Sequence, residues 1–211
     1  MANNETTLDN ACIDMLKEVG HICTGNATIA LGQVVNQRIE LNIPDLQLMD
    51  SEKVIDQLQG TQEVLVGVSI QLLGKLSGNV VLMFPEKSAY TLIDSISQMR
   101  GGEIGSATEY GVSTLKEIGN IVISAYLATL STFTKSVILH STPNLICGTL
   151  DTIFNVAFNK IVREKTQIIL IETFFDINEK DIHGSFFLIF EPHAVKRLID
   201  ESKASGKDQN Q

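Results

Sequence analysis

The sequence predicts a mixed α/β (α+β) protein with pseudo-twofold symmetry, in which a mainly antiparallel sheet carries two long helices packed outside it. Two segments, 16–46 and 115–145, share residues at a constant offset of 99 positions. Apolar, strand-like runs follow each segment, and a helical pattern closes each half. Neither half is large enough to cover both faces of its own sheet, so we expect the halves to share one core.

The internal repeat extends over most of the 211 residues. Within the first segment pair, the identities are Leu16/Leu115, Lys17/Lys116, Glu18/Glu117, Gly20/Gly119, Ile22/Ile121, Leu31/Leu130, Ile39/Ile138, Pro44/Pro143 and Leu46/Leu145. Further along, the offset becomes 106, with Gly78/Gly184 and Phe84/Phe190. We therefore expect repeats at about 10–100 and 106–201, a single domain over 1–201, and a disordered polar tail at 202–211.

The first half is expected to begin with a helix that Asp9 or Asn10 caps. Pro44 ends the first strand, and Gly101-Gly102 ends the last helix of this half. The expected order is helix 11–35, strand 38–43, extended segment 46–49, short helix 51–58, hairpin strands 64–70 and 78–84, and helix 85–99.

The second half is expected to repeat this order. A capping box, Ser106-Ala-Thr-Glu109, precedes its first helix. The elements that follow are strand 136–140, an extended and then helical stretch at 146–159, paired strands 167–175 and 184–190, and a helix that Pro192 opens.

One polar line follows the otherwise apolar helix of the second half. On a helix, Ser113, Glu117, Asn120 and Ser124 fall within an arc of about 60°. A carboxylate and a carboxamide therefore face the same way, one turn apart. The site has no His, Cys or Lys partner to activate a nucleophile, and one carboxylate does not hold a divalent ion alone. These groups suit a helper that completes another protein's active centre, and we expect no metal on this chain.

The spacing of this second site resembles a known signature. Ser/Asp-x-x-x-Glu-x-x-Asn, then 22 residues and Pro, is similar to the motif of the CheC/CheX/FliY phosphatases of bacterial and archaeal chemotaxis. Ser113, Glu117, Asn120 and Pro143 match it completely. The resemblance covers nearly the whole chain, because the two halves repeat beyond the motif.

The resemblance implies an enzyme, a hydrolase that acts on the aspartyl phosphate of a phosphorylated CheY-type response regulator in two-component signalling. Asn120 would hold the attacking water, and Glu117 would contact the regulator's lysine. Ser113 and Pro143 would shape the site. Mg²⁺ would be supplied by the regulator, with no cofactor on this chain. Such catalysis by positioning suits phosphoryl transfer.

The first site departs from the motif at one position. Asp14, Glu18 and Pro44 fit, but His21 stands where the family has Asn. An imidazole presents one nitrogen at a different reach from an amide, so we expect this degenerate site to be weak or silent, with Glu18 still able to dock the regulator. A phospho-accepting His21 is a less favoured alternative. Glu18-x-x-His21 also matches a di-iron motif, which requires a second copy that this chain lacks.

A non-enzymatic adaptor is the alternative function. The family resemblance makes the receptor deamidase CheD a candidate partner, besides phosphorylated CheY. In members that bind CheD, an acidic residue follows the second proline by five positions. Here that position is Gly148, with Asp151 three residues later, which argues against CheD. A third hypothesis is a structural module like the middle domain of flagellar switch proteins. Those domains lack the Glu/Asn signature, so the presence of Glu117 and Asn120 argues against this hypothesis.

Composition narrows the remaining classes. The net charge of −9 argues against nucleic acid as a partner. The start of the chain lacks a signal-peptide pattern, and the apolar stretch 64–84 is interrupted by Gln71 and Lys75, so we expect a cytoplasmic protein without a membrane span. Two further sets of residues are expected to be structural: the free, buried thiols of Cys12, Cys23 and Cys147, and the imidazoles of His140, His183 and His193.

Overall fold

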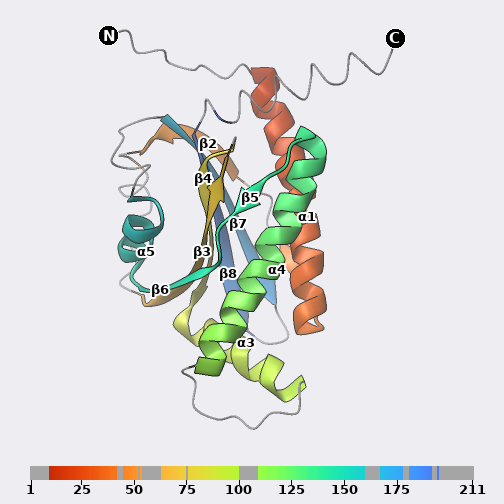
Figure 1. The fold of residues 1–211 in the computed structure, drawn as a ribbon. Helices are drawn as coiled ribbons and strands as arrows, with labels where there is room; N and C mark the ends of the chain where they lie inside the picture. The colour runs from red at the N-terminus through yellow and green to blue at the C-terminus, as the bar shows by residue number, and fades with distance from the viewer. Residues whose placement is uncertain are drawn as a thin grey trace.

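A computed structural model describes residues 10–41, 45–51, 53, 63–74, 76–99, 109–159, 167–177, 181–191 and 194. These residues form three layers, with a sheet in the middle (Figure 1). One face of the sheet carries α1 (Asn10–Val35), α3 (Glu86–Met99) and α4 (Glu109–Thr134), and the other carries α5 (Leu150–Ala157). The two motif helices thus lie outside the sheet, as predicted.

The sheet is antiparallel at every described strand pair. Its strands are β1 (Glu40–Leu41), β2 (Asp45–Asp50), β3 (Leu65–Leu73), β4 (Gly78–Pro85), β5 (Leu139–His140), β6 (Asn144–Gly148), β7 (Gln167–Ile177) and β8 (Ile182–Phe190). Their order is β1-β7-β8-β4-β3-β5, with β2 also on β7 and β6 also on β3. The predicted fold class is confirmed.

The two halves exchange their short strands. β2 belongs to the first half but pairs with β7 of the second, where Leu48 lies opposite Ile169. In the same way, β6 of the second half pairs with β3 of the first, where Leu145 lies opposite Val68. At the centre of the sheet, β4 of the first half pairs with β8 of the second. Each half therefore completes the sheet of the other.

Both faces of the central strands are buried. Val66, Val68 and Ile70 of β3 point into the core beneath α1, α3 and α4. Val81 and Met83 of β4 point into a second core beneath α5. This double burial explains why these strands appear in the sequence as continuous apolar runs rather than as a polar–apolar alternation.

The motif helices α1 and α4 lie side by side and run antiparallel (Figure 1). Asn26 Nδ2 donates a hydrogen bond of 2.8 Å to Thr129 Oγ1, which joins the middle of α1 to the C-terminal half of α4. Towards the C-terminal end of α1, Val34 shares a cavity with Ile118 and Ile121 of α4. Each helix is 26 residues long, and these two places of contact lie at different points along their length.

Equivalent left-handed residues end the two motif helices. Asn36 has φ 51° and Lys135 has φ 49°, exactly one repeat offset apart. After each of them, a backbone N–H donates back into the helix, from residue 37 to residue 32 at 3.1 Å and from residue 136 to residue 131 at 3.2 Å. This is the hydrogen bond of a left-handed helix cap.

Replacing Lys135 with glycine is expected to stabilise the protein. An L-residue in the left-handed region costs roughly 1–2 kcal/mol, and the extra freedom of glycine in the unfolded chain takes back about half of that gain. A gain of about 1 kcal/mol raises the melting temperature of a chain of this size by roughly 2–4 °C. Thermal unfolding measures it. Asn36→Gly is the matched control with a smaller gain, because asparagine adopts this conformation readily; a lower melting temperature for Lys135→Gly would contradict the prediction.

Two predicted strands begin later than expected. The strand predicted at 38–43 is described only at Glu40–Leu41, and the one predicted at 136–140 only at Leu139–His140. The helix caps explain the second case, because Ser131 Oγ donates a hydrogen bond of 2.6 Å to the carbonyl oxygen of Ser136. Ser136, two residues beyond the last residue of α4, is held by this cap and does not join the sheet.

Several predictions fall outside the described residues. Of the helix predicted at 51–58, only residues 51 and 53 are described, and of the capping box only Glu109. Pro44, the tail at 202–211 and, apart from the helical Ala194, the helix from Pro192 also lie outside. Within the described part of the chain, no helix is long and apolar enough to cross a membrane.

The expectation of buried thiols is confirmed for Cys23 and wrong for Cys147. Burial raises the pKa of Cys23 to about 12, which keeps it a protonated, unreactive thiol. Ile146 points into the core beneath α5, so the alternation of β6 turns Cys147 to the opposite face of the sheet, where it is exposed. The side chain of Cys12 is outside the described set.

Candidate functional site

Close packing of α4 on the sheet positions the second site. A Cβ atom at Gly119 would lie 2.4 Å from Cγ1 of Val68, a fully buried residue of β3. Only glycine permits the helix backbone to come this near the strand. Ile118 and Gly119 therefore face the core, and Glu117 and Asn120, on either side of them, are exposed.

The residues of the second site share the outer face of α4. Ser113, Glu117 and Asn120 are all exposed, at the spacing that places them along one line. Pro143 is half-buried and directly precedes β6, whose first residue, Asn144, pairs with Ser69 of β3. The proline thus lies in the connection that leads from the motif helix to the exchanged strand.

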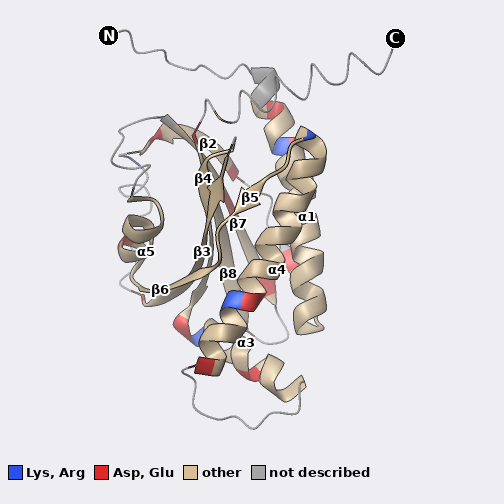
Figure 2. Cartoon of the chain, in the orientation of Figure 1, with Lys and Arg blue, Asp and Glu red and all other residues tan. Residues whose placement is uncertain are grey.

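The residues of the first site occupy the same positions on α1. Asp14, Glu18 and His21 are exposed, and Val19 and Gly20 between them are buried. Figure 2 shows that charged residues are few along both helices. Each glutamate has a lysine directly before it in the sequence, Lys17 before Glu18 and Lys116 before Glu117.

The two helices are seated differently. The nearest atom to a Cβ at Gly20 would be the hydroxyl oxygen of Tyr126, at 4.0 Å. Tyr126 itself is buried, and its ring packs on Phe186 of β8 with centroids 5.1 Å apart. Burial raises the pKa of this phenol well above its ordinary value, so it stays neutral and acts as a spacer. At these equivalent glycines, α4 touches the sheet and α1 faces a tyrosine.

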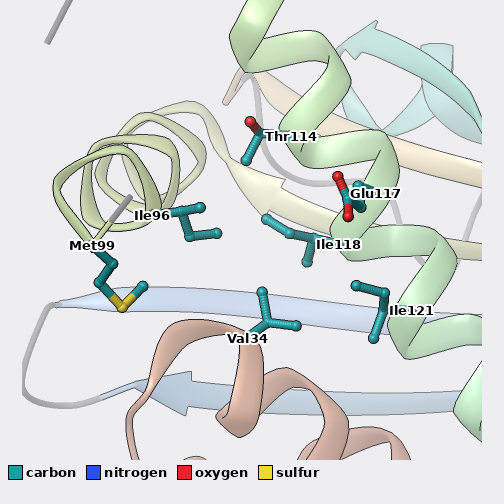
Figure 3. A pocket seen from close by; sticks show the side chains of 7 residues that line it. All are labelled: Val34, Ile96, Met99, Thr114, Glu117, Ile118 and Ile121. Atoms are coloured by element: carbon teal, nitrogen blue, oxygen red, sulfur yellow. The ribbon is translucent and has the colours of Figure 1, made fainter. Parts of the chain in front are cut away.

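A hollow of about 220 Å³ lies beside Glu117, and we name it the Glu117 hollow. α4, the end of α3 and the end of α1 surround it, and their side chains point towards a common space (Figure 3). Its lining residues are Val34, Ile96, Met99, Thr114, Glu117, Ile118 and Ile121. Glu117 is the charged member of this set, which is otherwise apolar apart from Thr114.

The sequence pattern did not reveal the Glu117 hollow. Ile96 and Met99 follow the helical period of α3 and resemble core residues, and Ile96 is indeed buried. Met99, however, is 46% exposed at the end of the helix. The available signal in the sequence was the place of this methionine, one residue before Arg100 and a Gly-Gly break that ends the predicted helix.

The repeat places different residues around the first site. Phe133 is the counterpart of Val34, and Ile22 is the counterpart of Ile121. Both are exposed, at 41% and 42%. Of the counterpart of α3, only Ala194 is described. The first site therefore differs from the second in its surroundings as well as in His21.

Other polar groups belong to different parts of the molecule. His183 lies between Asp176 and Asp181 at the turn from β7 to β8, and hydrogen bonds to these two carboxylates raise its pKa. Lys87 Nζ of α3 lies 3.0 Å from Asp181. His140 Nδ1 contacts the carbonyl oxygen of Ser141 at 2.9 Å. Within the described ranges, no three or more His, Cys, Asp or Glu residues gather as a metal site would require.

The CheC-like family matches residues 111–147, the stretch that contains Glu117, Asn120 and Pro143. "CheY-P phosphatase CheC" of Bacillus subtilis strain 168 is 22% identical over 191 residues, which cover 89% of this chain and 91% of that protein.

Solved structures show the same fold. FliY of Thermotoga maritima has a TM-score of 0.72 at 20% identity, covering 94% of this chain and 98% of that one. The middle domain of FliM from H. pylori has a TM-score of 0.66 at 10% identity, covering 92% and 99%. CheX in a CheX-CheY-BeF3-Mg complex from Borrelia burgdorferi has a TM-score of 0.54 at 19% identity, covering 82% and 99%.

The molecule is thus an α+β protein of the fold that FliY and CheX share, with its motif helices side by side on one face of the sheet. The chain is similar to the CheC-like family over residues 111–147 and, over most of its length, to a CheY-P phosphatase. The resemblance predicted from Ser113, Glu117, Asn120 and Pro143 is confirmed at the level of the family.

Proposed function

We propose that this chain is a phosphatase that hydrolyses the aspartyl phosphate of a CheY-type response regulator at its second site. The observation that carries the proposal is the exposure of Glu117 and Asn120, one turn apart on a helix that Gly119 seats against the sheet. A rigid helix is a precise platform for a group that must reach into a partner's active site.

The chemistry is catalysis by positioning. The side-chain amide of Asn120 holds a water molecule in line with the phosphorus, and Glu117 pairs with the regulator's lysine. The water oxygen attacks phosphorus, the bond from phosphorus to the aspartyl oxygen breaks, and inorganic phosphate leaves. The regulator supplies the Mg²⁺ that neutralises the transferring group. Ser113 and Pro143 support the helix face and the connection to β6.

The relatives support this proposal in outline. One relative bears the name of a CheY-P phosphatase, and a protein of the same fold has been crystallised as a complex with CheY. The direct test is the loss of phosphate from a phosphorylated CheY-type regulator with Mg²⁺, with and without a catalytic amount of this protein. We expect several turnovers per chain. An unchanged rate over a range of protein concentrations would contradict the proposal.

The adaptor function is the second candidate, because the fold is also that of the FliM middle domain. An adaptor would bind the phosphorylated regulator without changing the lifetime of the phosphate. The position at which CheD-binding members of the family carry an acidic residue is Gly148 in this chain, which argues against CheD binding. A Cβ at Gly148 would lie 2.9 Å from both Cβ and Cγ2 of Thr152, so the turn from β6 to α5 has no room for an acidic side chain without a shift.

We expect His21→Asn to activate the first site. The substitution restores the amide on an exposed face that already carries Glu18. The cleanest background is Asn120→Ala, in which the second site is silent. There, His21→Asn should raise the rate of phosphate loss several-fold above the Asn120→Ala chain alone, because the positioned water returns. His21→Gln is the matched control, since its amide lies one methylene further out; equal rates for both substitutions, or no gain for His21→Asn, would contradict the prediction.

A further inference from the structure

A small cavity lies between α1 and the sheet, beneath the helix that carries the first site, and we name it the α1 cavity. Its volume is about 20 Å³, the room of one water molecule. The floor is a row of side chains that lie next to one another across β7, β8 and β4, and α1 contributes to the roof. The lining residues that carry the argument are Thr173, Phe186 and Leu82 in the floor and Thr24 and Thr28 in the roof.

Two buried hydroxyl groups line the α1 cavity. Thr24 is 4% exposed and Thr173 is 1% exposed, and within the described part of the chain neither Oγ1 atom has a hydrogen-bond partner. Other helical threonines, such as Thr28 and Thr129, donate to the carbonyl oxygen four residues earlier, at 2.7 and 3.0 Å. Buried side-chain hydroxyls are hydrogen-bonded in the large majority of cases, so these two require a polar partner inside the cavity.

The second half of the repeat has apolar side chains at the equivalent places. The offset of 99 makes Ile123 of α4 the counterpart of Thr24. Thr173 of β7 corresponds to Ile70 of β3, because their partners on β8 and β4 are 106 positions apart. Both isoleucines are fully buried. Threonine therefore replaces isoleucine twice, once on each of the two surfaces that meet beneath α1.

From these observations we infer that the α1 cavity binds one water molecule, which joins α1 to β7. The hydroxyls of Thr24 and Thr173 donate to the water oxygen. The water donates to Oγ1 of Thr28, whose own hydrogen is already used in its bond to the carbonyl oxygen of Thr24. Three hydrogen bonds are the usual number for a buried water. The helix of the first site thus rests on a hydrated layer at this level, whereas α4 presents an isoleucine at the equivalent place.

A double-mutant cycle with the nearly isosteric change of threonine to valine tests the inference. Thr24→Val or Thr173→Val alone takes one partner from the water and leaves the other hydroxyl dependent on it, so each should lower the melting temperature by roughly 2–4 °C. The double variant leaves no buried hydroxyl of this pair to satisfy, so it should lose less than the sum of the single losses. Thr132→Val, at an exposed position of α4, is the matched control with an unchanged melting temperature. If each single valine raised the melting temperature and the gains were additive, the hydroxyls would share no water and the inference would fail.

A direct measurement detects the water itself. In a high-resolution crystal structure we expect one ordered water within hydrogen-bond distance of Thr24, Thr28 and Thr173. In solution, oxygen-17 relaxation dispersion should count one long-lived water fewer in the double variant than in wild type. A direct hydrogen bond between the hydroxyls of Thr24 and Thr173 would also couple them in the cycle, but it would appear in the crystal structure as a closed cavity and overturn the inference. The regulator takes no part in these measurements, so their outcome is independent of the proposed function.

Discussion

Asn120→Ala is expected to lower kcat for phosphate release from the regulator by about 100-fold or more, and to leave the melting temperature within about 1 °C. The exposed amide contacts no part of the core, since Ile118 and Gly119 are the residues of this turn that face inward. Its loss removes the group that would hold the attacking water, and misplacement of a reacting group by 1 Å already costs about 100-fold. Single-turnover release of phosphate from the regulator measures it.

A measurement of the Kd distinguishes the loss of a catalytic group from a loss of docking. The Kd of the Asn120→Ala chain for the activated regulator should stay within a few-fold of wild type, because Glu117 remains to dock the regulator. Thr132→Ala, an exposed position further along α4, is the surface control with unchanged kcat. A strong fall in melting temperature for Asn120→Ala would assign the side chain a structural role, and retained activity would remove it from the mechanism.

The regular elements were accessible from sequence because burial imposes local patterns. The 26-residue helices α1 and α4 show an apolar face interrupted by a polar line, and β3 and β4 show continuous apolar runs between turn residues. The constant repeat offset then relates the two halves. These signals come from neighbours within one element, which is why they survive in a single sequence.

Contacts between distant elements were not accessible. No local sequence pattern predicts that β2 of the first half pairs with β7 of the second. Nor does a pattern show that the ends of α1 and α3 meet beside Glu117, because Val34 and Met99 come from separate parts of the chain. The exposure of Cys147 likewise follows from its place in the sheet and not from its apolar neighbours. Such features require the tertiary arrangement.

Gly119→Ala is expected to destabilise the protein by about 2 kcal/mol, which lowers the melting temperature by roughly 4–8 °C. The added Cβ would lie 2.4 Å from Cγ1 and 2.8 Å from Cβ of Val68, and β3 on either side of Val68 is paired with β4 and β6. α4 must therefore move away from the sheet, which exceeds the gain of roughly 1 kcal/mol that alanine brings to a helix interior. Because Asn120 is the next residue, kcat should fall as well.

Gly20→Ala is the matched control, since the same residue stands at the equivalent position of the repeat. There the nearest atom to the new Cβ is 4.0 Å away, an ordinary contact, so the helix gains alanine's propensity without a clash. We expect the melting temperature of Gly20→Ala to stay level or rise, whereas that of Gly119→Ala falls. Adding Val68→Ala to the Gly119→Ala chain should recover part of the loss, because it makes room for the new Cβ. Thermal unfolding of the four chains measures both effects. Equal shifts at Gly20 and Gly119 would show that helix propensity, and not the close approach of α4 to β3, governs these positions.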